Sequence, residues 1–390
     1  MPWSNRSIMD QRLLFIADYR RAVYSIAELC RRFEISRPTA YKWIARYESG
    51  GVRGLHDRDR RPHHSPQATP PHVVDALLEA RRRHPTWGAK KLLTILQRRR
   101  PSWPWPARAT VCDVLKRHGL VRCRRRSVRR GHPGQPATHM DTPNATWSAD
   151  FKGEFKTRDG LYCYPLTMAD GCSRYVLACQ ALDGTTHDGT KRVMRHTFQE
   201  YGLPERIRTD NGVPFASNAL RRLSRLAVWW IRLGITPELI EPASPYQNGR
   251  HERMHKTLKA ETTRPPCASR AAQQRRFAQF RHEFNHERPH EALNQDTPAS
   301  CYQPSPRPFP TRLPPLEYPE HFEVRRVSHN GGIRWNGHWV NVSHVLAEQL
   351  IAFEEIDNGI WTVYFGTLDL GRFHERTHSI KDALGKHTRR

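Results

Sequence analysis

Three acidic residues, Asp150, Asp210 and Glu252, stand in short, motif-like stretches of a strongly basic chain. The stretches read Trp-Ser-Ala-Asp-Phe-Lys at 147–152, Arg-Thr-Asp-Asn-Gly at 208–212 and Tyr-Gln-Asn-Gly-Arg-His-Glu-Arg at 246–253. Three carboxylates held close together repel one another unless cations lie between them. Their hard oxygen atoms favour Mg²⁺ or Mn²⁺ as those cations. Two such ions ~3.5–4 Å apart can activate a nucleophile and stabilise the leaving oxygen of a phosphodiester.

Each acid taken singly also has an ordinary structural explanation. Asp150 can end a strand, and Asp210 with Asn211 and Gly212 can form a tight turn. Glu252 can form an exposed helical ion pair with Lys256. Their order along the chain is more informative, because an acid on a first strand, one at a later strand end and one on a following helix can converge at one edge of a sheet.

A flank of basic residues surrounds the acids and is expected to hold a phosphate backbone over the metals. It comprises Lys152, Arg208, Arg250, Arg253, Lys256 and Lys259, and Asn211 and Asn248 are added as further DNA contacts. On the helix that carries Glu252, we expect His255, Lys256 and Lys259 to share the face of Glu252.

The elements that must position the acids alternate between strand and helix across residues 140–300. Strands are predicted at 161–168, 174–182, 205–209 and 235–240, and helices at 186–201, 219–233 and 269–285, with a further helix around Glu252. A hairpin followed by strand–helix alternation predicts a mixed sheet flanked by helices.

The first 60 residues predict a helix-turn-helix domain that binds DNA. Helices at 25–33 and 37–47 flank a three-residue turn, and Ser36 is a suitable N-cap. Ala40, Trp43 and Ile44 can pack inward, while Arg37, Thr39, Lys42 and Arg46 are expected to face the DNA. The alternative is a helical hairpin with no DNA-binding role.

A second helical domain is predicted at 71–130, after a stretch rich in Gly and Pro at 50–71 that contains a linker at 61–70. Its helices end near Gly119 and form a weaker helix-turn-helix candidate. A basic run follows, in which Arg124, Arg125 and Arg126 are expected to contact phosphates. The alternative is a solvated, flexible segment.

The C-terminal part begins with a Pro-rich linker at 301–319. Short strands at 332–335, 338–342, 351–355 and 360–365, with Asn-Gly turns at 336–337 and 358–359, predict a small β-barrel over 320–375. Residues 376–390 are expected to form a basic tail.

Together these motifs resemble the DDE integrase core of bacterial insertion-sequence transposases, which is related to retroviral integrase. The stretches around Asp150, Asp210 and Glu252 carry the resemblance, together with Asn-His-Glu-Arg-Pro-His-Glu-Ala-Leu at 285–293. The resemblance implies a ribonuclease H-like α/β core in which Asp150, Asp210 and Glu252 are the catalytic ligands of two Mg²⁺ or Mn²⁺ ions. The spacer of 41 residues between Asp210 and Glu252 is longer than is common in the family, and the extra length is placed near 227–233. The His/Cys zinc module of retroviral integrases is absent, and helix-turn-helix units stand in its place.

Composition agrees with a nucleic-acid partner. The formal net charge is +26, with 64 Lys and Arg against 38 Asp and Glu, and neutralising phosphates drives sequence-independent binding. An anionic membrane surface is the alternative, but no apolar anchor accompanies the charge. The eight cysteines form no C-x-x-C pair, which disfavours zinc ribbons and disulfide scaffolds. We expect a cytoplasmic, nucleoid-associated protein with no membrane span and no small-molecule cofactor.

The sequence therefore predicts a metal-dependent transposase. The N-terminal helices are expected to bind terminal repeats of double-stranded DNA. The core is then expected to cleave the end phosphodiesters and join the 3′-OH ends to target DNA, as a homodimer or higher oligomer. Two alternatives remain open: a DNA-binding regulator with a decayed core, and a ribonuclease H-like metal nuclease acting on RNA or hybrid duplexes.

Overall fold

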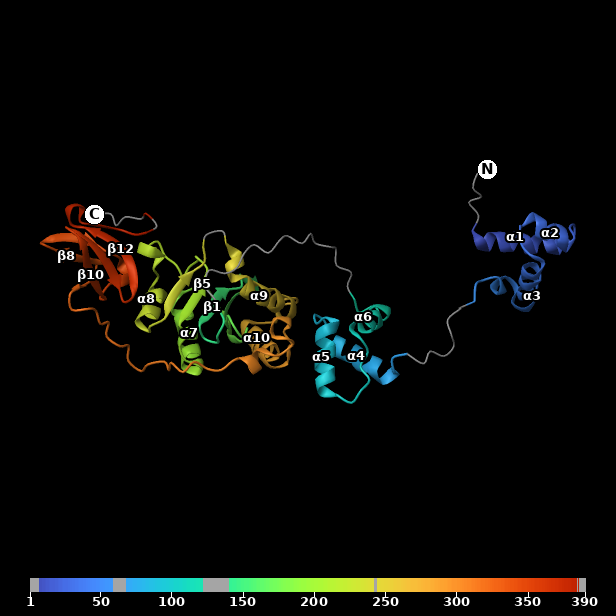
Figure 1. Cartoon of the computed structure of the whole chain (residues 1–390), viewed down its shortest axis with the longest axis horizontal. Helices are drawn as coiled ribbons and strands as arrows, with labels where there is room; N and C mark the ends of the chain where they lie inside the picture. Colours follow the sequence, from blue (N-terminus) through green and yellow to red (C-terminus); the bar gives the residue numbers. More distant parts are fainter. Residues whose placement is uncertain (1–6, 59–67, 122–139, 242–243, 384, 386–390) are drawn as a thin grey trace. The chain divides into compact units, whose positions relative to one another are not determined.

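The computed structural model describes residues 7–58, 68–121, 140–241, 244–383 and 385 (Figure 1). The chain divides into two compact units, Met1–Ala68 and Thr69–Arg390. No helix in the described part of the chain is both long enough and apolar enough to cross a membrane.

The first unit is a helix-turn-helix domain built from α1 (Ile8–Arg21), α2 (Ile26–Arg32) and α3 (Arg37–Gly54). Capping boxes at Ser7 and Ser25 begin the first two helices. Ser36 occupies the N-cap position of α3, but its hydroxyl meets the Thr39 hydroxyl at 2.9 Å and makes no capping bond. The helix continues into the stretch expected to be irregular from residue 50, and Gly51 interrupts it with a φ of 58°.

The second unit begins with three short helices, α4 (Pro71–Arg83), α5 (Ala89–Arg99) and α6 (Arg108–Arg117). Leu77, Leu92 and Val111 are fully buried at their shared core. The three helices lie where the apolar periodicity predicts them. The basic run with Arg124, Arg125 and Arg126 lies outside the described residues.

The central sheet confirms the predicted mixed α/β core. Its strands are β1 (Thr146–Phe151), β2 (Phe155–Lys156), β3 (Tyr162–Asp170), β4 (Val176–Leu182), β5 (Arg206–Thr209) and β6 (Thr236–Leu239). The strand order is β4-β3-β1-β5-β6, and the short β2 also pairs with β3. The β3 strand is antiparallel to both β1 and β4, whereas β1, β5 and β6 are parallel.

Helices of this core connect and cover the strands (Figure 1). They are α7 (His187–Tyr201), α8 (Arg225–Arg232), α9 (Gly249–Thr262) and α10 (Arg270–His282), which continues as a π-helical turn at Glu283–Glu287. Short 3₁₀ turns lie at Leu220–Arg222, Pro245–Asn248, Glu291–Leu293 and Pro298–Cys301. The single helix expected at 219–233 is divided, because Arg221 adopts a left-handed φ of 54°.

The C-terminal strands form an open five-stranded sheet and a separate hairpin. The sheet runs β13 (Ser379–Lys381), β12 (Leu368–His374), β11 (Ile360–Phe365), β10 (Leu350–Asp357) and β7 (Glu323–Arg326), and the hairpin pairs β8 (Gly332–Trp335) with β9 (His338–Asn341). Two 3₁₀ turns lie at His344–Leu346 and Glu375–Thr377. Hydrogen bonds among the described strands do not close a barrel, so the predicted barrel is not confirmed. The sheet also extends into the expected tail, because β13 pairs with β12. Ile380 on β13 is fully buried.

One apolar cluster joins the central sheet to the C-terminal sheet through α8. All six residues from Leu226 to Ile231 are buried, and the cluster contains Ile207 of β5 as well as Phe353 of β10. The spacer between Asp210 and Glu252 therefore contains a helix that packs between two sheets. Arg232 at the end of α8 also donates to the Gln349 side chain of the C-terminal part.

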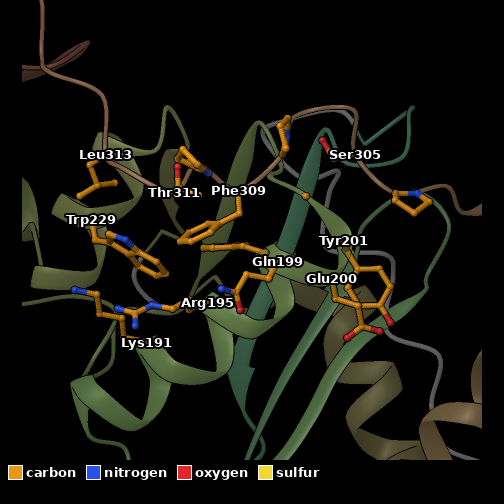
Figure 2. Close-up of a pocket in the computed structure, with 15 residues that line it drawn as sticks. Lys191, Arg195, Gln199, Glu200, Tyr201, Trp229, Ser305, Phe309, Thr311 and Leu313 are labelled. Carbon is orange, nitrogen blue, oxygen red and sulfur yellow. The ribbon is translucent and has the colours of Figure 1, made fainter.

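The Pro-rich segment expected to be a linker is bound to the core along 302–309. Arg307 donates to the carbonyl oxygens of Pro204, Leu233 and Gly234, and Phe309 packs against Phe198 of α7. Figure 2 shows a pocket that is lined by this segment, by residues of α7 and by Trp229. Its volume is about 770 Å³. None of the three candidate acids lines it.

Candidate metal and DNA-processing site

Two of the three candidate acids lie at the carboxyl ends of neighbouring parallel strands. β1 pairs with β5 in a register that sets Ser148 opposite Arg208. Asp150, on β1, and Asp210, directly after β5, each follow that pair by two residues. The register brings both acids to the same edge of the sheet, where the charge of Asp210 raises the pKa of Asp150.

The third acid comes from α9. Glu252 lies in the first turn of this helix and is exposed. Burial, together with the negative charges of Asp210 and Glu252, raises the pKa of Asp150 to about 7. The three acids therefore lie close enough for their charges to interact, which is the condition under which cations are favoured between them.

A buried histidine network lies beside Asp150, and the sequence interpretation missed it. His251 Nδ1 lies 2.7 Å from the Ser148 hydroxyl, and its Nε2 lies 2.7 Å from the Thr167 hydroxyl. His255 Nε2 lies 2.6 Å from the same Thr167 oxygen. Burial lowers the pKa of His251 to about 3 and lowers that of His255, with a further contribution from the charge of His251.

The expectation that His255 shares the exposed face of Glu252 is wrong. His255 is buried, as are His251, Met254, Leu258 and Thr262. These residues recur at spacings of three and four, which is the pattern of a buried helical stripe. The same spacing can be read from the sequence, but three of the five buried positions are polar residues, which are usually expected to be exposed.

Several basic residues expected to hold DNA remain placed for that role. Arg253, Lys256 and Lys259 are exposed on α9 beside Glu252. Lys152 is half-buried, and its charge lowers the pKa of Asp150. In the first unit, Arg37 and Lys42 are exposed on α3, whereas Thr39 and Arg46 are half-buried. Ala40, Trp43 and Ile44 are buried, as predicted.

Arg208 does not hold phosphate in this structure. Its side chain is 1% exposed, pairs with Glu238 at 2.7 Å and donates to the Gln247 carbonyl. It ties β5 to β6 and to the turn that precedes α9. Its charge is therefore used inside the fold, and its place in the predicted cationic flank was wrong.

The other predicted contacts have structural partners or are enclosed. Asn211 donates to the Ile240 carbonyl and accepts from Arg222. Asn248 is buried at the start of α9. Arg250 has an exposed side chain that donates to the Gly171 carbonyl at 2.7 Å.

The donor atoms around Asp150 fit a divalent ion. One side-chain oxygen or nitrogen from each of Asp150, His251 and His255 lies within 4.8 Å of the other two, although both ring nitrogens of His251 also contact hydroxyl groups. The raised pKa of Asp150 agrees with a cation site. Burial makes the ionised carboxylate unfavourable, and a bound cation would stabilise that charge. The described residues thus contain an Asp/His cluster beside the two further acids.

Family models match most of the chain in pieces. Two models described as integrase core domains match residues 141–245 and 233–298. A helix-turn-helix model matches 11–63, and a homeodomain-like model matches 39–131. The three acids all fall inside the integrase core matches.

Individual relatives are of two kinds. The chain is 28% identical over 241 residues to the uncharacterized 39.2 kDa protein of insertion element IS476 from Xanthomonas euvesicatoria, covering 60% of this chain and 66% of that protein. It is 32% identical over 132 residues to the Gag-Pol polyprotein of baboon endogenous virus, covering 34% of this chain and only 7% of the polyprotein.

Among solved structures, the HTLV-2 integrase catalytic core domain in complex with magnesium aligns with a TM-score of 0.33 at 16% identity. The alignment covers 42% of this chain and 98% of that one. Together, the matched models show an integrase core domain across residues 141–298, preceded by helix-turn-helix domains, and the insertion-element relative is similar over 60% of this chain.

Proposed function

We propose that this chain is a DNA transposase that binds the terminal repeats of a mobile element, cleaves the end phosphodiesters and joins the 3′-OH ends to target DNA. The arrangement of Asp150 and Asp210 at the carboxyl ends of paired parallel strands, with Glu252 near enough to raise the pKa of Asp150, carries the proposal. The insertion-element relative and the helix-turn-helix matches support it.

In this proposal the three acids hold two Mg²⁺ or Mn²⁺ ions. When bound, such ions lower the pKa of water and stabilise charge on the attacking and leaving oxygens. Arg253, Lys256 and Lys259 offer positive charge along α9 beside the acids, where a phosphate backbone would lie. Arg37 and Lys42 on α3 would contact the terminal repeats.

We further propose that the protein works as a dimer or higher oligomer, because two DNA ends must meet for strand transfer. The C-terminal sheet would add contacts to DNA or to another subunit, as a closed barrel or as the open sheet. We place the reaction in the cytoplasm, on the nucleoid.

A strand-transfer assay with labelled end DNA tests the catalytic acids. Asp150→Asn, Asp210→Asn and Glu252→Gln should each lower joining by roughly 10²-fold or more, because each removes a charge that holds the metals. Asp183→Asn is the matched control, since Asp183 is exposed just after β4. Unchanged joining by Asp210→Asn would remove the catalytic assignment and leave the DNA-binding regulator as the better explanation.

A binding competition between DNA and RNA or hybrid duplexes tests the substrate class. We expect duplex DNA carrying the element ends to compete best at 0.15 M salt, because a protein this basic binds any polyanion at low salt. A preference for hybrid duplexes would favour the nuclease alternative.

A further inference from the structure

The hydrogen bonds around Thr167 determine which ring nitrogens carry protons. The Thr167 hydroxyl oxygen lies 2.7 Å from His251 Nε2, 2.6 Å from His255 Nε2 and 3.1 Å from the Asp150 carbonyl oxygen. A hydroxyl has one hydrogen to donate and two lone pairs that accept. Because a carbonyl can only accept, all three contacts are satisfied when Thr167 donates to Asp150 and each histidine donates from Nε2.

This arrangement engages both ring nitrogens of His251. In this pattern its Nε2 donates to Thr167 and its Nδ1 accepts from the Ser148 hydroxyl at 2.7 Å. The Ser148 hydrogen then serves this contact in preference to the longer one of 3.3 Å to the Ala169 carbonyl oxygen. The imidazole is buried, and both contacts are satisfied by a ring with one donor and one acceptor nitrogen. His251 therefore has no lone pair left for a metal ion.

His255 differs from His251 in that, among the described residues, only one of its two ring nitrogens makes a hydrogen bond. Its Nε2 is used by Thr167, so in the neutral ring Nδ1 keeps its lone pair. That atom lies 3.6 Å from Asp150 Oδ2, which is longer than a hydrogen bond, and the side chain is only 6% exposed. In the described part of the chain, Nδ1 makes no other contact. The lone pairs of His255 Nδ1 and Asp150 Oδ2 thus lie near each other, and no proton is assigned between these two atoms.

A divalent ion fits that gap. Mg²⁺–oxygen bonds are ~2.1 Å long, and a separation of 3.6 Å is less than twice that length. We propose that His255 supplies a nitrogen ligand, through Nδ1, to the divalent ion that Asp150 holds, and that His251 positions this ligand through Thr167. This inference rests on the proposed metal site and adds a ligand to it. Imidazole binds ions that are softer than Mg²⁺. The site should therefore select Mn²⁺ over Mg²⁺ more strongly than a site made of carboxylates alone.

Electron spin-echo spectroscopy on the full chain loaded with one equivalent of Mn²⁺ tests the ligand directly. Protein labelled with ¹⁵N only in histidine should show a ¹⁵N coupling to Mn²⁺. The coupling should disappear in Asp150→Asn, which removes the ion, and in His255→Gln, which removes only the nitrogen ligand. The Gln amide can still reach Thr167 from the position of Nε2, so the fold is kept, and circular dichroism checks that. His196→Gln, on the exposed face of α7, is the matched control.

The Mn²⁺ affinity gives a second measurement. His255→Gln should weaken Mn²⁺ binding by roughly 10-fold or more, since even outer-shell partners of a ligand have effects of that size. His255→Asn places an amide near the position of Nδ1 and should recover part of this affinity without the ¹⁵N coupling.

The outcomes separate this inference from the proposed function. Asp150-dependent Mn²⁺ binding without a histidine coupling overturns the role of His255 and leaves the proposed metal site standing. Mn²⁺ binding that does not depend on Asp150 overturns both. A coupling that persists in His255→Gln assigns the nitrogen to another histidine and overturns the inference.

Discussion

At the scale of single residues, neighbours rather than sequence motifs decide what each charged group does. Asp150 and Arg208 lie on paired strands, and both were predicted to serve the site. The Asp150 carboxyl is partly buried beside two other acids. Arg208 is instead enclosed and paired with Glu238. The three acids could be identified from sequence because their motifs are distinctive, whereas no pattern distinguishes Arg208 from an exposed arginine.

The raised pKa of Asp150 predicts a pH-dependent stability of the metal-free protein. The folded pKa of about 7 lies above the ordinary aspartate pKa of 3.8, so the folded state binds more protons between these values and stability falls as pH rises through that window. Asp150→Asn should therefore raise the melting temperature at pH 8 by roughly 2–6 °C. The difference should vanish below pH 4. Calorimetry with chelator present measures it, and an equal effect at both pH values would contradict the assignment.

Arg208 predicts a stability effect without a DNA-binding effect. Arg208→Met leaves Glu238 without the guanidinium that holds β5 to β6, and breaking a buried pair of this kind costs about 3–5 kcal/mol. Urea unfolding measures the loss. Lys256→Met is the matched comparison: it should leave stability unchanged and lower the salt slope of DNA binding by about 1. If instead Arg208→Met lowers that slope and leaves stability intact, Arg208 contacts DNA.

At the scale of elements, two segments acquire roles that their composition does not indicate. The long spacer before Glu252 becomes α8, whose buried face joins two sheets. The Pro-rich segment is held to the core by Arg307. Asn285, in the 285–293 motif, donates to and accepts from the backbone of Val176, and so fixes the end of α10 to β4. Such contacts join residues far apart in the chain, so periodicity cannot reveal them.

The Arg307 contacts predict that the Pro-rich segment stabilises the core. Arg307→Ala removes charged donors from the carbonyl oxygens of Pro204, Leu233 and Gly234, and should lower the free energy of unfolding by about 2–3 kcal/mol. Arg312→Ala, an exposed arginine in the same segment, is the control. Equal stability of the two variants in urea would show that the segment is a free linker.

At the scale of the whole molecule, the first helix-turn-helix domain and the three acids belong to separate units. The first helix-turn-helix domain forms its own core around Leu29 and Trp43. The acids and the C-terminal sheet belong to the unit Thr69–Arg390.

This division predicts the behaviour of a truncated chain. Residues 69–390 should keep the far-ultraviolet circular dichroism of the second unit and should still bind Mn²⁺. They should lose preference for end DNA over random DNA by roughly 10-fold or more, because base contacts specify while phosphate contacts only position. Competition binding at fixed salt measures this, and undiminished preference would assign end recognition to α4–α6 or to the core.

Local sequence patterns predicted most helices and strands, the mixed sheet and the set of three acids, but not the division of the helix expected at 219–233. Apolar periodicity is a local property, and the acidic motifs are short enough to read directly. Three features could be seen only in the folded chain: Asp150 on β1 lies beside Asp210, which directly follows β5, Arg208 is enclosed, and His251 and His255 lie near Asp150. These outcomes depend on strand register and on which helical face the sheet covers. Both are fixed by packing between distant segments, where the free energy of burial outweighs the preference of a polar side chain for water.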